Sequence, residues 1–359
     1  MRALVPIGLL ALAVAACGQT ISIEEYKPKS TLVVPANPLT RAKFPFVDVH
    51  GHPRGNFTPE RVDNLIKEMD AMNMRAMVNL DGRSGEALKK NVGFARSRYP
   101  DRFVVFCNLD FKGIDDPQWG QHAARQLEQD VANGASGLKI YKNLGMDVRD
   151  AKGRVPVDDP RLDPVWAMAG KLKIPVLIHT ADPAPFWQPQ DTNNERWLEL
   201  KEMPGRKRSP DRYPPWETVI GEQHRVFRKH SQTTFINAHL GWYGNNLGEL
   251  GRLMDEMPNM HTEIGAVLAE LGRQPRFARQ WFIRYQNRVL FGKDTYTPSE
   301  YPYYFRVLET ADEYFDYYRR RHAFWQMYGL DLPDEVLRKL YYKNALRIIP
   351  GLSHKGFPQ

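Results

Sequence analysis

The chain has 359 residues, of which 42% are hydrophobic and 11% aromatic, and its formal net charge is +8 at pH 7. This length and apolar content suffice for one large folded domain. Lysine and arginine are mostly interleaved with Asp and Glu, and the two tight basic clusters, at residues 206–208 and 319–321, lie beside no nucleic-acid-binding motif. The charge distribution therefore argues against a nucleic-acid partner and favours solvated surface groups.

The N-terminus has the features of a targeting segment. Arg2 precedes an unbroken apolar stretch at residues 3–16. A stretch of this length is too short to cross the ~30 Å hydrocarbon core of a membrane as a helix, but it is typical of a signal peptide. The stretch ends in Val14-Ala15-Ala16-Cys17, which resembles the lipobox of bacterial lipoproteins.

That resemblance implies cleavage before Cys17 and acylation of this cysteine, which would anchor the chain in a membrane. We therefore expect a signal peptide at residues 1–16, a tether rich in Pro, Lys, Ser and Thr at 17–43, and the catalytic domain at 44–359. The expected location is the bacterial cell envelope, on the periplasmic face of the outer membrane because Gly18 replaces Asp after the cysteine. The alternative is an ordinary secretory signal with an incidental cysteine.

Short apolar, β-branched runs alternate with longer amphipathic runs after residue 44, which is typical of strand–helix units. The predicted strands are residues 46–50, 75–80, 103–109, 137–141, 175–179, 234–239, 260–264 and 288–292. The predicted helices are residues 59–73, 86–99, 118–133, 160–171, 216–230, 246–257 and 275–285, with further helices over about 302–349. This alternation predicts an α/β fold, the (β/α)8 TIM barrel with a C-terminal helical extension. The alternative, a doubly wound sheet, would have a Gly-rich first turn that this sequence lacks.

Ionisable residues gather where the predicted strands end. His50 and His52 end the first strand, His179 the fifth and His239 the sixth, and Asp294 follows the eighth. Side chains at positions i and i+2 of a strand share one face, so both histidines of the first strand can point into the barrel mouth. Imidazoles with a carboxylate suit a divalent ion such as zinc. The sequence therefore predicts a metal site at the carboxyl ends of the strands.

Four short motifs carry a resemblance to a known family. They are Asp48-Val49-His50-Gly51-His52, Ile178-His179, Ala238-His239-Leu240-Gly241 and Phe291-Gly292-Lys293-Asp294. In this order they resemble the metal-site motifs of the amidohydrolase superfamily, and above all those of amidohydrolase family 2, although Lys293 stands where the family usually has Thr. The resemblance runs from about residue 44 to residue 350. That family includes hydratases, decarboxylases and lactonases of small carboxylated or aromatic compounds.

The resemblance implies that His50, His52, His179 and Asp294 are metal ligands. His239 would polarise the substrate or transfer protons, and Asp294 would accept the proton of a metal-activated water and deliver it to the leaving group. The expected cofactor is one Zn²⁺, with Mn²⁺ or a second metal as the alternatives.

Lys139, on the fourth predicted strand, leaves the number of metals open. Some members of the superfamily bridge two ions with a carboxylated lysine on that strand. The alternative is an ammonium group that pairs with a substrate carboxylate.

The leading hypothesis for the function is metal-dependent hydrolysis of a C–O or C–N bond in a small ester, lactone or amide. The first alternative is nonoxidative decarboxylation of an aromatic or unsaturated acid, and the second is a non-catalytic ligand-binding lipoprotein. The expected partners are a small-molecule substrate, the membrane through Cys17 and no nucleic acid, and the resemblance adds a homodimer.

Substrate-binding residues are predicted in the loops that follow the strands. Arg83, after the second strand, is expected to clamp an anion or else to lie in a plain turn. Glu263 ends the seventh strand and is expected to bind substrate or to neutralise a cation. The insertion at 180–215 is expected to close over the site, because long loops in compact domains tend to bind ligands. The candidate contacts in and beyond this insertion are Trp187, Glu195, Arg196 and Trp242.

Overall fold

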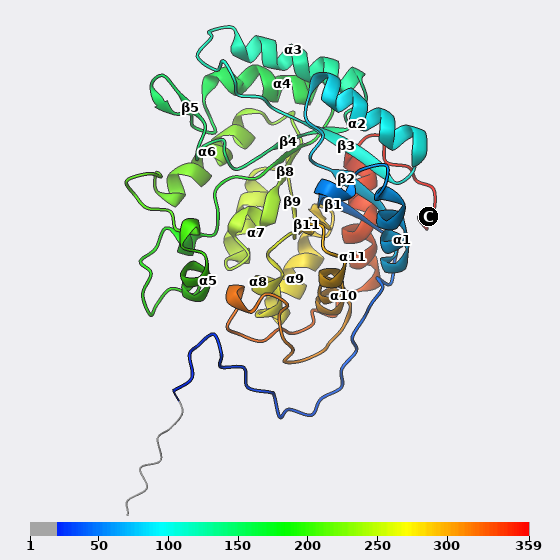
Figure 1. Cartoon of the computed structure of the whole chain (residues 1–359), viewed down its shortest axis with the longest axis vertical. Helices are drawn as coiled ribbons and strands as arrows, with labels where there is room; N and C mark the ends of the chain where they lie inside the picture. The colour runs from blue at the N-terminus through cyan, green and yellow to red at the C-terminus, as the bar shows by residue number, and fades with distance from the viewer. Residues whose placement is uncertain (1–19, 359) are drawn as a thin grey trace, which may run out of the picture. The chain divides into compact units, whose positions relative to one another are not determined.

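A computed structural model describes residues 20–358 of the chain (Figure 1). The chain divides into two units, residues 1–33 and residues 34–359. The described residues of the first unit form a turn, in which the Glu25 and Tyr26 amides donate to the Ser22 carbonyl, and they contain no helix or strand. The expected signal peptide and Cys17 lie outside the described residues and stay predictions.

Parallel strands of the second unit form one sheet that surrounds the core. They are β1 (Phe46–His52), β2 (Met74–Asn79), β3 (Phe103–Asn108), β4 (Gly137–Ile140), β7 (Val176–Ile178), β8 (Phe235–Asn237), β9 (Met260–Glu263), β10 (Val289–Leu290) and β11 (Asp294–Thr295). Their order across the sheet is β10-β9-β8-β7-β4-β3-β2-β1-β11. The outermost strands, β10 and β11, belong to one chain segment, and between them the Phe291 carbonyl accepts a 2.9 Å hydrogen bond from the Val49 amide of β1. The sheet therefore returns on itself, and the predicted (β/α)8 barrel is confirmed.

Helices follow the strands and cover the outer face of the sheet (Figure 1). They are α1 (Val62–Met72), α2 (Gly85–Arg98), α3 (Trp119–Ala132), α4 (Asp163–Lys171), α5 (Trp197–Glu202), α6 (Trp216–Lys229), α7 (Leu247–Glu256), α8 (Leu268–Gly272) and α9 (Pro275–Tyr285). The predicted helices before residue 290 lie at these places, with ends shifted by a few residues. The short helices α5 and α8 and the hairpin of β5 (Arg149–Asp150) and β6 (Gly153–Arg154) were not predicted.

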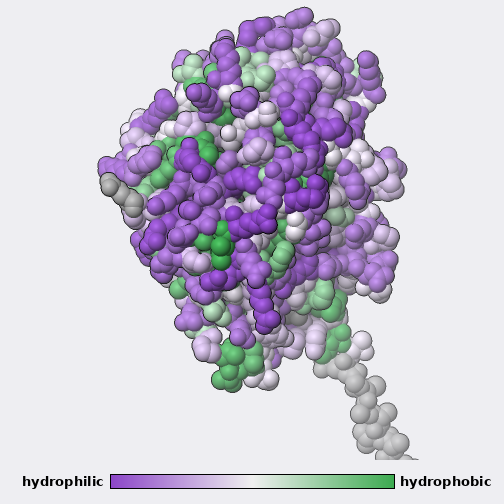
Figure 2. Space-filling model, turned by 180° about the vertical axis from the view of Figure 1, so that it is seen from behind, coloured by the Kyte–Doolittle hydropathy of each residue, from purple (hydrophilic) through white to green (hydrophobic). Residues whose placement is uncertain are grey.

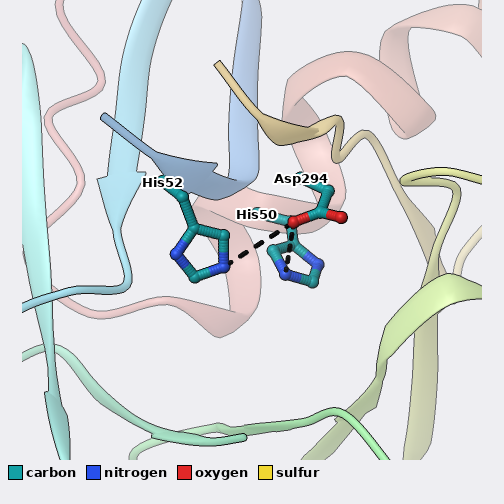
Figure 3. A group of neighbouring side chains, drawn as sticks. All are labelled: His50, His52 and Asp294. Atoms are coloured by element: carbon teal, nitrogen blue, oxygen red, sulfur yellow. Dashed lines mark ion pairs between the residues drawn. The ribbon is translucent and has the colours of Figure 1, made fainter. Parts of the chain in front are cut away.

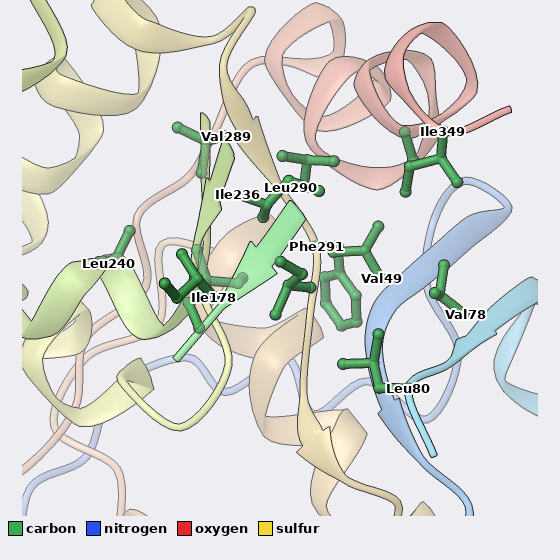
Figure 4. Packing of buried hydrophobic residues seen from close by; sticks show 14 of the residues in the cluster. Val49, Val78, Leu80, Ile178, Ile236, Leu240, Val289, Leu290, Phe291 and Ile349 are labelled. Carbon is green, nitrogen blue, oxygen red and sulfur yellow. The ribbon is translucent and has the colours of Figure 1, made fainter. Parts of the chain in front are cut away.

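The strands are buried on both faces, because helices pack outside them and strand side chains fill the barrel. Every residue of β1 is buried, as expected for a strand in this position. Figure 4 shows aliphatic side chains from several strands meeting in one cluster, among them Val49, Val78, Ile178 and Leu290. This packing fixes the strand ends, and with them the residues that the ends carry.

The C-terminal extension is helical at both ends and irregular between them. Its helices are α10 (Tyr301–Glu309), α11 (Asp334–Arg338), the π-helix η8 (Lys339–Lys343) and α12 (Asn344–Ile348). The prediction of helices across 302–349 is therefore wrong for residues 310–333, which contain only the 3-10 turn η7 (Arg320–His322) and a bridge between Phe315 and Met327. Gly329 and Pro333 disfavour a helix here, and the Asp312 carboxylate instead binds Arg306 at 2.6 Å.

Residues 34–43 of the expected tether belong to the second unit, and hydrogen bonds join them to its C-terminal extension. The backbone amide and Nδ2 of Asn37 each donate to the Asp312 carboxylate at 2.7 Å. The Lys43 amide donates to Glu309, and Lys43 Nζ pairs with Asp334 at 2.6 Å. Side-chain hydrogen bonds to the rest of the second unit therefore begin at about Asn37.

Most of the face in Figure 2 is hydrophilic, with apolar side chains in small separate patches. Phe324 and Phe277 are the most exposed aromatic residues of the second unit, at 76% and 48%. Scattered apolar groups of this kind are ordinary on a protein surface. Within residues 20–358, no helix has the length and hydropathy needed to cross a membrane.

Candidate metal centre

The strand register brings the motif residues together. β11 pairs with β1 so that Asp294 lies opposite Gly51, between His50 and His52. Alternate residues of β1 face the interior, which puts both imidazoles on the same side. Gly51 faces the neighbouring strand, where a β-carbon would lie 2.6 Å from Met77 Cγ. Glycine stands at this position because β1 and β2 approach too closely for a side chain.

His50, His52 and Asp294 form a group of converging donor atoms (Figure 3). His50 Nε2 and His52 Nε2 each lie 3.8 Å from Asp294 Oδ1, and the donor atoms of the three residues lie within 4.8 Å of one another. Zinc bonds of about 2.1 Å place two ligands of a tetrahedral shell about 3.4 Å apart. The observed spacing is therefore close to that of a metal shell.

Carboxylates lie within hydrogen-bond distance of Nδ1 in both β1 histidines, the ring nitrogen that points away from Asp294. His50 Nδ1 lies 2.9 Å from Glu263 Oε1, and His52 Nδ1 lies 2.7 Å from Asp81 Oδ1. Tyr141 also donates its hydroxyl to Asp81 Oδ1 at 2.8 Å. An ionised carboxylate only accepts hydrogen bonds, so Nδ1 carries the proton in both rings and each Nε2 faces inward as a lone pair. This is the usual arrangement behind metal-binding histidines.

Backbone carbonyls hold the outer nitrogens of the other two histidines. His239 Nδ1 lies 2.8 Å from the Gly265 carbonyl, and His179 Nε2 lies 3.1 Å from the Ala181 carbonyl. Because a carbonyl only accepts hydrogen bonds, these nitrogens carry the protons. The remaining nitrogens, His239 Nε2 and His179 Nδ1, are then lone pairs, and they face each other at 3.3 Å.

When the rings are neutral, all four imidazoles therefore turn an unprotonated nitrogen toward one region. Burial lowers the pKa of His50 and His179 well below the usual histidine value, and nearby cationic groups, including Lys139, lower it further. Both rings are thus neutral at pH 7, which is the form that binds metals. Facing lone pairs repel each other unless a cation lies among them. The donor set fits a divalent metal ion.

A strained turn positions His239. Residues 239–242 have φ values of 58, 54, 57 and 63°, so four consecutive residues are left-handed. Each non-glycine residue in this conformation costs roughly 1–2 kcal/mol. The His239 amide donates to Glu263 Oε1 at 2.6 Å, and the Trp242 indole donates to the Thr180 carbonyl at 3.0 Å. The Trp242 indole also stacks on the buried His239 ring, with the ring centroids 4.6 Å apart.

Asp48 sets the spacing between β1 and the segment that carries Asp294. Its Oδ1 accepts from the amides of His50 and Lys293 at 3.0 and 3.1 Å, and its Oδ2 accepts from the Tyr301 hydroxyl at 2.7 Å. Burial raises the pKa of Asp48 to about 6. Burial acts to raise the pKa of Asp294, but the positive charge that the surrounding histidines carry when protonated, together with that of Lys139, outweighs it and the pKa is lowered.

Lys139 lies at the inner edge of the same centre. It is 1% exposed, and its Nζ is 3.3 Å from His50 Nε2. Burial lowers its pKa to about 8, although the carboxylates of Asp294 and Glu263 act in the opposite direction. The position is compatible with both predicted roles, a second-metal ligand and a partner of a substrate carboxylate.

Two of the predicted substrate residues face the centre or a neighbouring cavity. Trp242 packs against His239 and His179, with ring centroids at 4.6 and 5.6 Å. Arg83 is exposed and lines a cavity beside Asp81.

Glu263 is placed differently from the substrate-binding prediction. Its side chain is fully buried, and its oxygens accept from His50 Nδ1 and from the amides of His239 and Gly265. It therefore orients the histidines.

The charged candidates of the insertion are engaged in ion pairs. Glu195 pairs with Arg273 at 2.8 Å, and Arg196 bonds Glu199 at 3.1 Å and Glu270 at 3.0 Å. The pairs with Arg273 and Glu270 tie the insertion to α8 and the residue after it, whereas the bond to Glu199 lies within the insertion.

The aromatic candidate of the insertion is also bonded locally. Trp187 donates its indole N–H to the Pro214 carbonyl at 2.8 Å, within the insertion itself. The space enclosed by Glu195, Arg196 and Trp242 is about 20 Å³, which is room for a water and not for an organic substrate.

Sequence reasoning did not assign roles to Asp81, Tyr141 and Asp48. Asp81 follows directly on one predicted strand and Tyr141 is the last residue of another, so their place at the barrel mouth could be inferred from the sequence pattern. Their contact with His52 could not be inferred, because it depends on how β1, β2 and β4 tilt around the barrel.

Comparisons with known proteins agree with this geometry. Residues 47–351 match the family model described as amidohydrolase. A search of the curated proteins gives no match.

Several solved structures share the fold. A putative amidohydrolase from Staphylococcus aureus is 15% identical, with 85% of this chain and 99% of that chain covered and a TM-score of 0.51. A 2,6-dihydroxybenzoate decarboxylase complexed with 2,6-dihydroxybenzoate is 16% identical, with coverage of 84% and 98% and a TM-score of 0.51. The 4-oxalomesaconate hydratase of Rhodopseudomonas palustris is 14% identical, with coverage of 86% and 96% and a TM-score of 0.50. At these identities the likeness shows the barrel fold.

Proposed function

Because the chain belongs to the amidohydrolase family, whose members are enzymes that bind a divalent metal ion, we propose that it is a metal-dependent hydrolase. The substrate is a small ester, lactone or amide, and the bond cleaved is C–O or C–N. The observation that carries this proposal is the convergence of unprotonated nitrogens from His50, His52, His179 and His239 beside the Asp294 carboxylate.

The residues of the centre divide the chemistry among them. His50, His52 and Asp294 would hold the divalent ion, which would supply Lewis acidity and activate a water at neutral pH. The Asp294 carboxylate accepts the proton of the attacking water and returns it to the leaving group. His239 would polarise the substrate: with a proton taken from solvent before the reaction and kept throughout it, Nε2 would donate to the substrate oxygen as negative charge develops there. Trp242 covers the His239 ring and excludes water from that side.

A substrate panel tests the reaction. Zinc-loaded protein is assayed against esters, lactones, amides and aromatic acids, with product formation and CO2 release both measured. Asp294→Asn is expected to lose the hydrolytic activity, whereas Asp316→Asn, an exposed aspartate in the C-terminal extension, keeps it. Full turnover by Asp294→Asn would overturn the assignment.

Nonoxidative decarboxylation is the second candidate function. It uses the same kind of centre, and a barrel with this fold acts as a 2,6-dihydroxybenzoate decarboxylase. Release of CO2 from an aromatic acid, with no hydrolysis of any ester, lactone or amide in the panel, would select this candidate.

The proposed ion is a single Zn²⁺. Imidazole nitrogens with one carboxylate are typical zinc ligands, and His50, His52 and Asp294 supply three of them. Metal analysis of the purified protein is expected to give about one equivalent of zinc. A reproducible two equivalents would make Lys139 the expected bridging ligand, and manganese in place of zinc would correct the ion.

The proposed location is the cell envelope, with the chain anchored through acylated Cys17. The support is the lipobox-like sequence at residues 14–17. Wild-type protein is expected to take up a fatty-acid label and to fractionate with membranes, and Cys17→Ala is expected to do neither. A homodimer is proposed from the family resemblance, and light scattering on the zinc-loaded protein measures it as a doubled mass.

A further inference from the structure

The exposed large hydrophobic side chains of the second unit lie in two segments of the chain. Within residues 34–358 they are Phe277, Tyr314 and Phe324, exposed by 48, 44 and 76%. Phe277 is in α9, and the other two are in the irregular segment 310–333, which Figure 1 shows in orange beside α8 and α9. Single exposed aromatic residues are ordinary, whereas their collection in one part of the surface indicates an interaction site.

Specific contacts hold the two segments together. The Arg273 guanidinium, just before α9, lies over the Trp325 ring, with 4.2 Å between Cζ and the ring centroid. Further along α9, Arg279 Nε donates to the Asp331 carbonyl at 2.9 Å. The helix α9 and residues 310–333 therefore form one continuous surface, which we call the extension face.

The extension face carries positive charge beside its exposed rings. Its two segments contain six arginines and four acidic residues, a net charge of +2, and α9 itself contains three arginines and neither Asp nor Glu. Arg276 is exposed next to Phe277 and forms no ion pair within residues 20–358. An arginine beside an exposed ring suits the surface of an anionic bilayer, because the ring enters the headgroup layer and the guanidinium binds lipid phosphates.

The tether joins the folded unit at the extension face. The backbone amide and Nδ2 of Asn37 donate to the Asp312 carboxylate, in the segment 310–333, at 2.7 Å. Asn37 is 20 residues beyond Cys17 in the sequence, and a chain of this length spans at most about 70 Å. An acyl anchor at Cys17 therefore brings the extension face closer to the membrane, on average, than the opposite side of the barrel.

From the rings, the charge and the tether we propose that the extension face docks on the surface of an anionic membrane. Phe324 and Phe277 enter the headgroup layer, and Arg276 binds lipid phosphates. This inference rests on the proposed cell-envelope location and adds a second membrane contact to the acyl anchor. The two contacts reinforce each other, because the anchor raises the local concentration of lipid at the face. The barrel is then held against the bilayer instead of moving freely on its tether.

Vesicle binding by the unacylated chain tests the face apart from the anchor. The chain from residue 17 onward with Cys17→Ser contains the whole second unit, residues 34–359, and is sedimented with vesicles of phosphatidylglycerol or of phosphatidylcholine. Binding to phosphatidylglycerol is expected to be at least about tenfold tighter and to weaken as salt is added. Equal binding to both lipids, or none to phosphatidylglycerol, would overturn the proposal. Loss of the hydrolase assignment, or an unacylated Cys17 in cells, leaves this result unchanged.

Variants assign the vesicle binding to the extension face. Phe324→Ser is expected to weaken binding to phosphatidylglycerol about tenfold, because the ring no longer leaves water, and Arg276→Gln about fivefold. The matched control is Arg125→Gln, since Arg125 is also exposed but lies on α3, at the other end of the barrel in Figure 1. Binding by Phe324→Ser/Arg276→Gln within twofold of the unsubstituted chain, or an equal loss in Arg125→Gln, would overturn the proposal. A dimer that Phe324→Ser converts to a monomer in light scattering would assign the face to a second copy of the chain instead.

Discussion

The histidines of β1 and those that follow β7 and β8 are held in different ways. His50 and His52 each donate Nδ1–H to a carboxylate, at 2.9 and 2.7 Å. His179 and His239 donate to backbone carbonyls, at 3.1 and 2.8 Å. The Glu263 carboxylate is also 3.7 Å from His239 Nδ1, which is beyond hydrogen-bond distance. Both arrangements fix the tautomer. Only a carboxylate adds a negative charge behind the ring, and this makes the inward nitrogen a stronger base.

This difference indicates a division of roles. The β1 histidines, with Asp294 between them, therefore suit the proposed role of permanent metal ligands. His239 has an Nδ1–H held by a neutral carbonyl and a ring stacked on Trp242, which suits the proposed role of polarising the substrate. His179 faces His239 and lies outside the two potential metal-ligand groups found among the described residues.

The largest expected effect contrasts His50 with His239. His50→Asn and Asp294→Asn are expected to bind no metal and to lose at least roughly 10³-fold in turnover, because both the ion and the proton acceptor depend on them. His239→Asn is expected to keep the metal and to lose about 10²–10⁴-fold in turnover. Metal content and kcat are measured on the same preparations. Metal-free His239→Asn, or metal-loaded His50→Asn with full turnover, would break the division of roles.

The next effect tests the carboxylates behind the β1 histidines. Glu263→Gln and Asp81→Asn are expected to weaken metal affinity by about 10–100-fold, because an amide no longer raises the basicity of the ring. Competition with a chromophoric chelator measures the affinity, and Asp316→Asn serves as the control. Metal affinities within twofold of the wild type would show that these carboxylates do not make His50 and His52 better metal ligands than His179 and His239.

His224, a buried histidine outside the centre, shows what burial by itself does to a histidine pKa. His224 packs on Tyr243, and burial lowers its pKa to about 4. The unfolded state then binds the proton near pH 6.5 and the folded state does not, so stability is lost as the pH falls below about 6.5. Between pH 7 and pH 5 the loss is about 2 kcal/mol. Urea unfolding of His224→Gln is expected to show a pH dependence smaller by this amount, and an unchanged dependence would contradict the shift.

The smallest effect concerns the insertion. Glu195 is half-exposed and pairs with Arg273, so Glu195→Gln is expected to change stability by less than about 1 kcal/mol and turnover by less than about twofold. Thermal unfolding and steady-state kinetics measure the two quantities. A large loss of turnover with unchanged stability would return Glu195 to the substrate-binding role that the sequence predicted.

The barrel could be predicted because its strands are short, continuous apolar runs, such as residues 103–109, that only a sheet covered on both faces accommodates. The histidines could be predicted because strand ends place them at the mouth. The irregular segment 310–333 could not be predicted, because residues far away in the sequence hold it in place. One example is the hydrogen bond from Asn37 Nδ2 to the Asp312 carboxylate. The pairing of Glu263 with His50 could not either, because it joins residues far apart in the sequence through the strand arrangement.

Anomalous diffraction from zinc-loaded crystals tests the central claim most directly. The account predicts one strong zinc peak within bonding distance of His50 Nε2, His52 Nε2 and an Asp294 carboxylate oxygen. A peak bonded to other residues, two peaks of equal height bridged by Lys139, or no peak in zinc-saturated protein would contradict it.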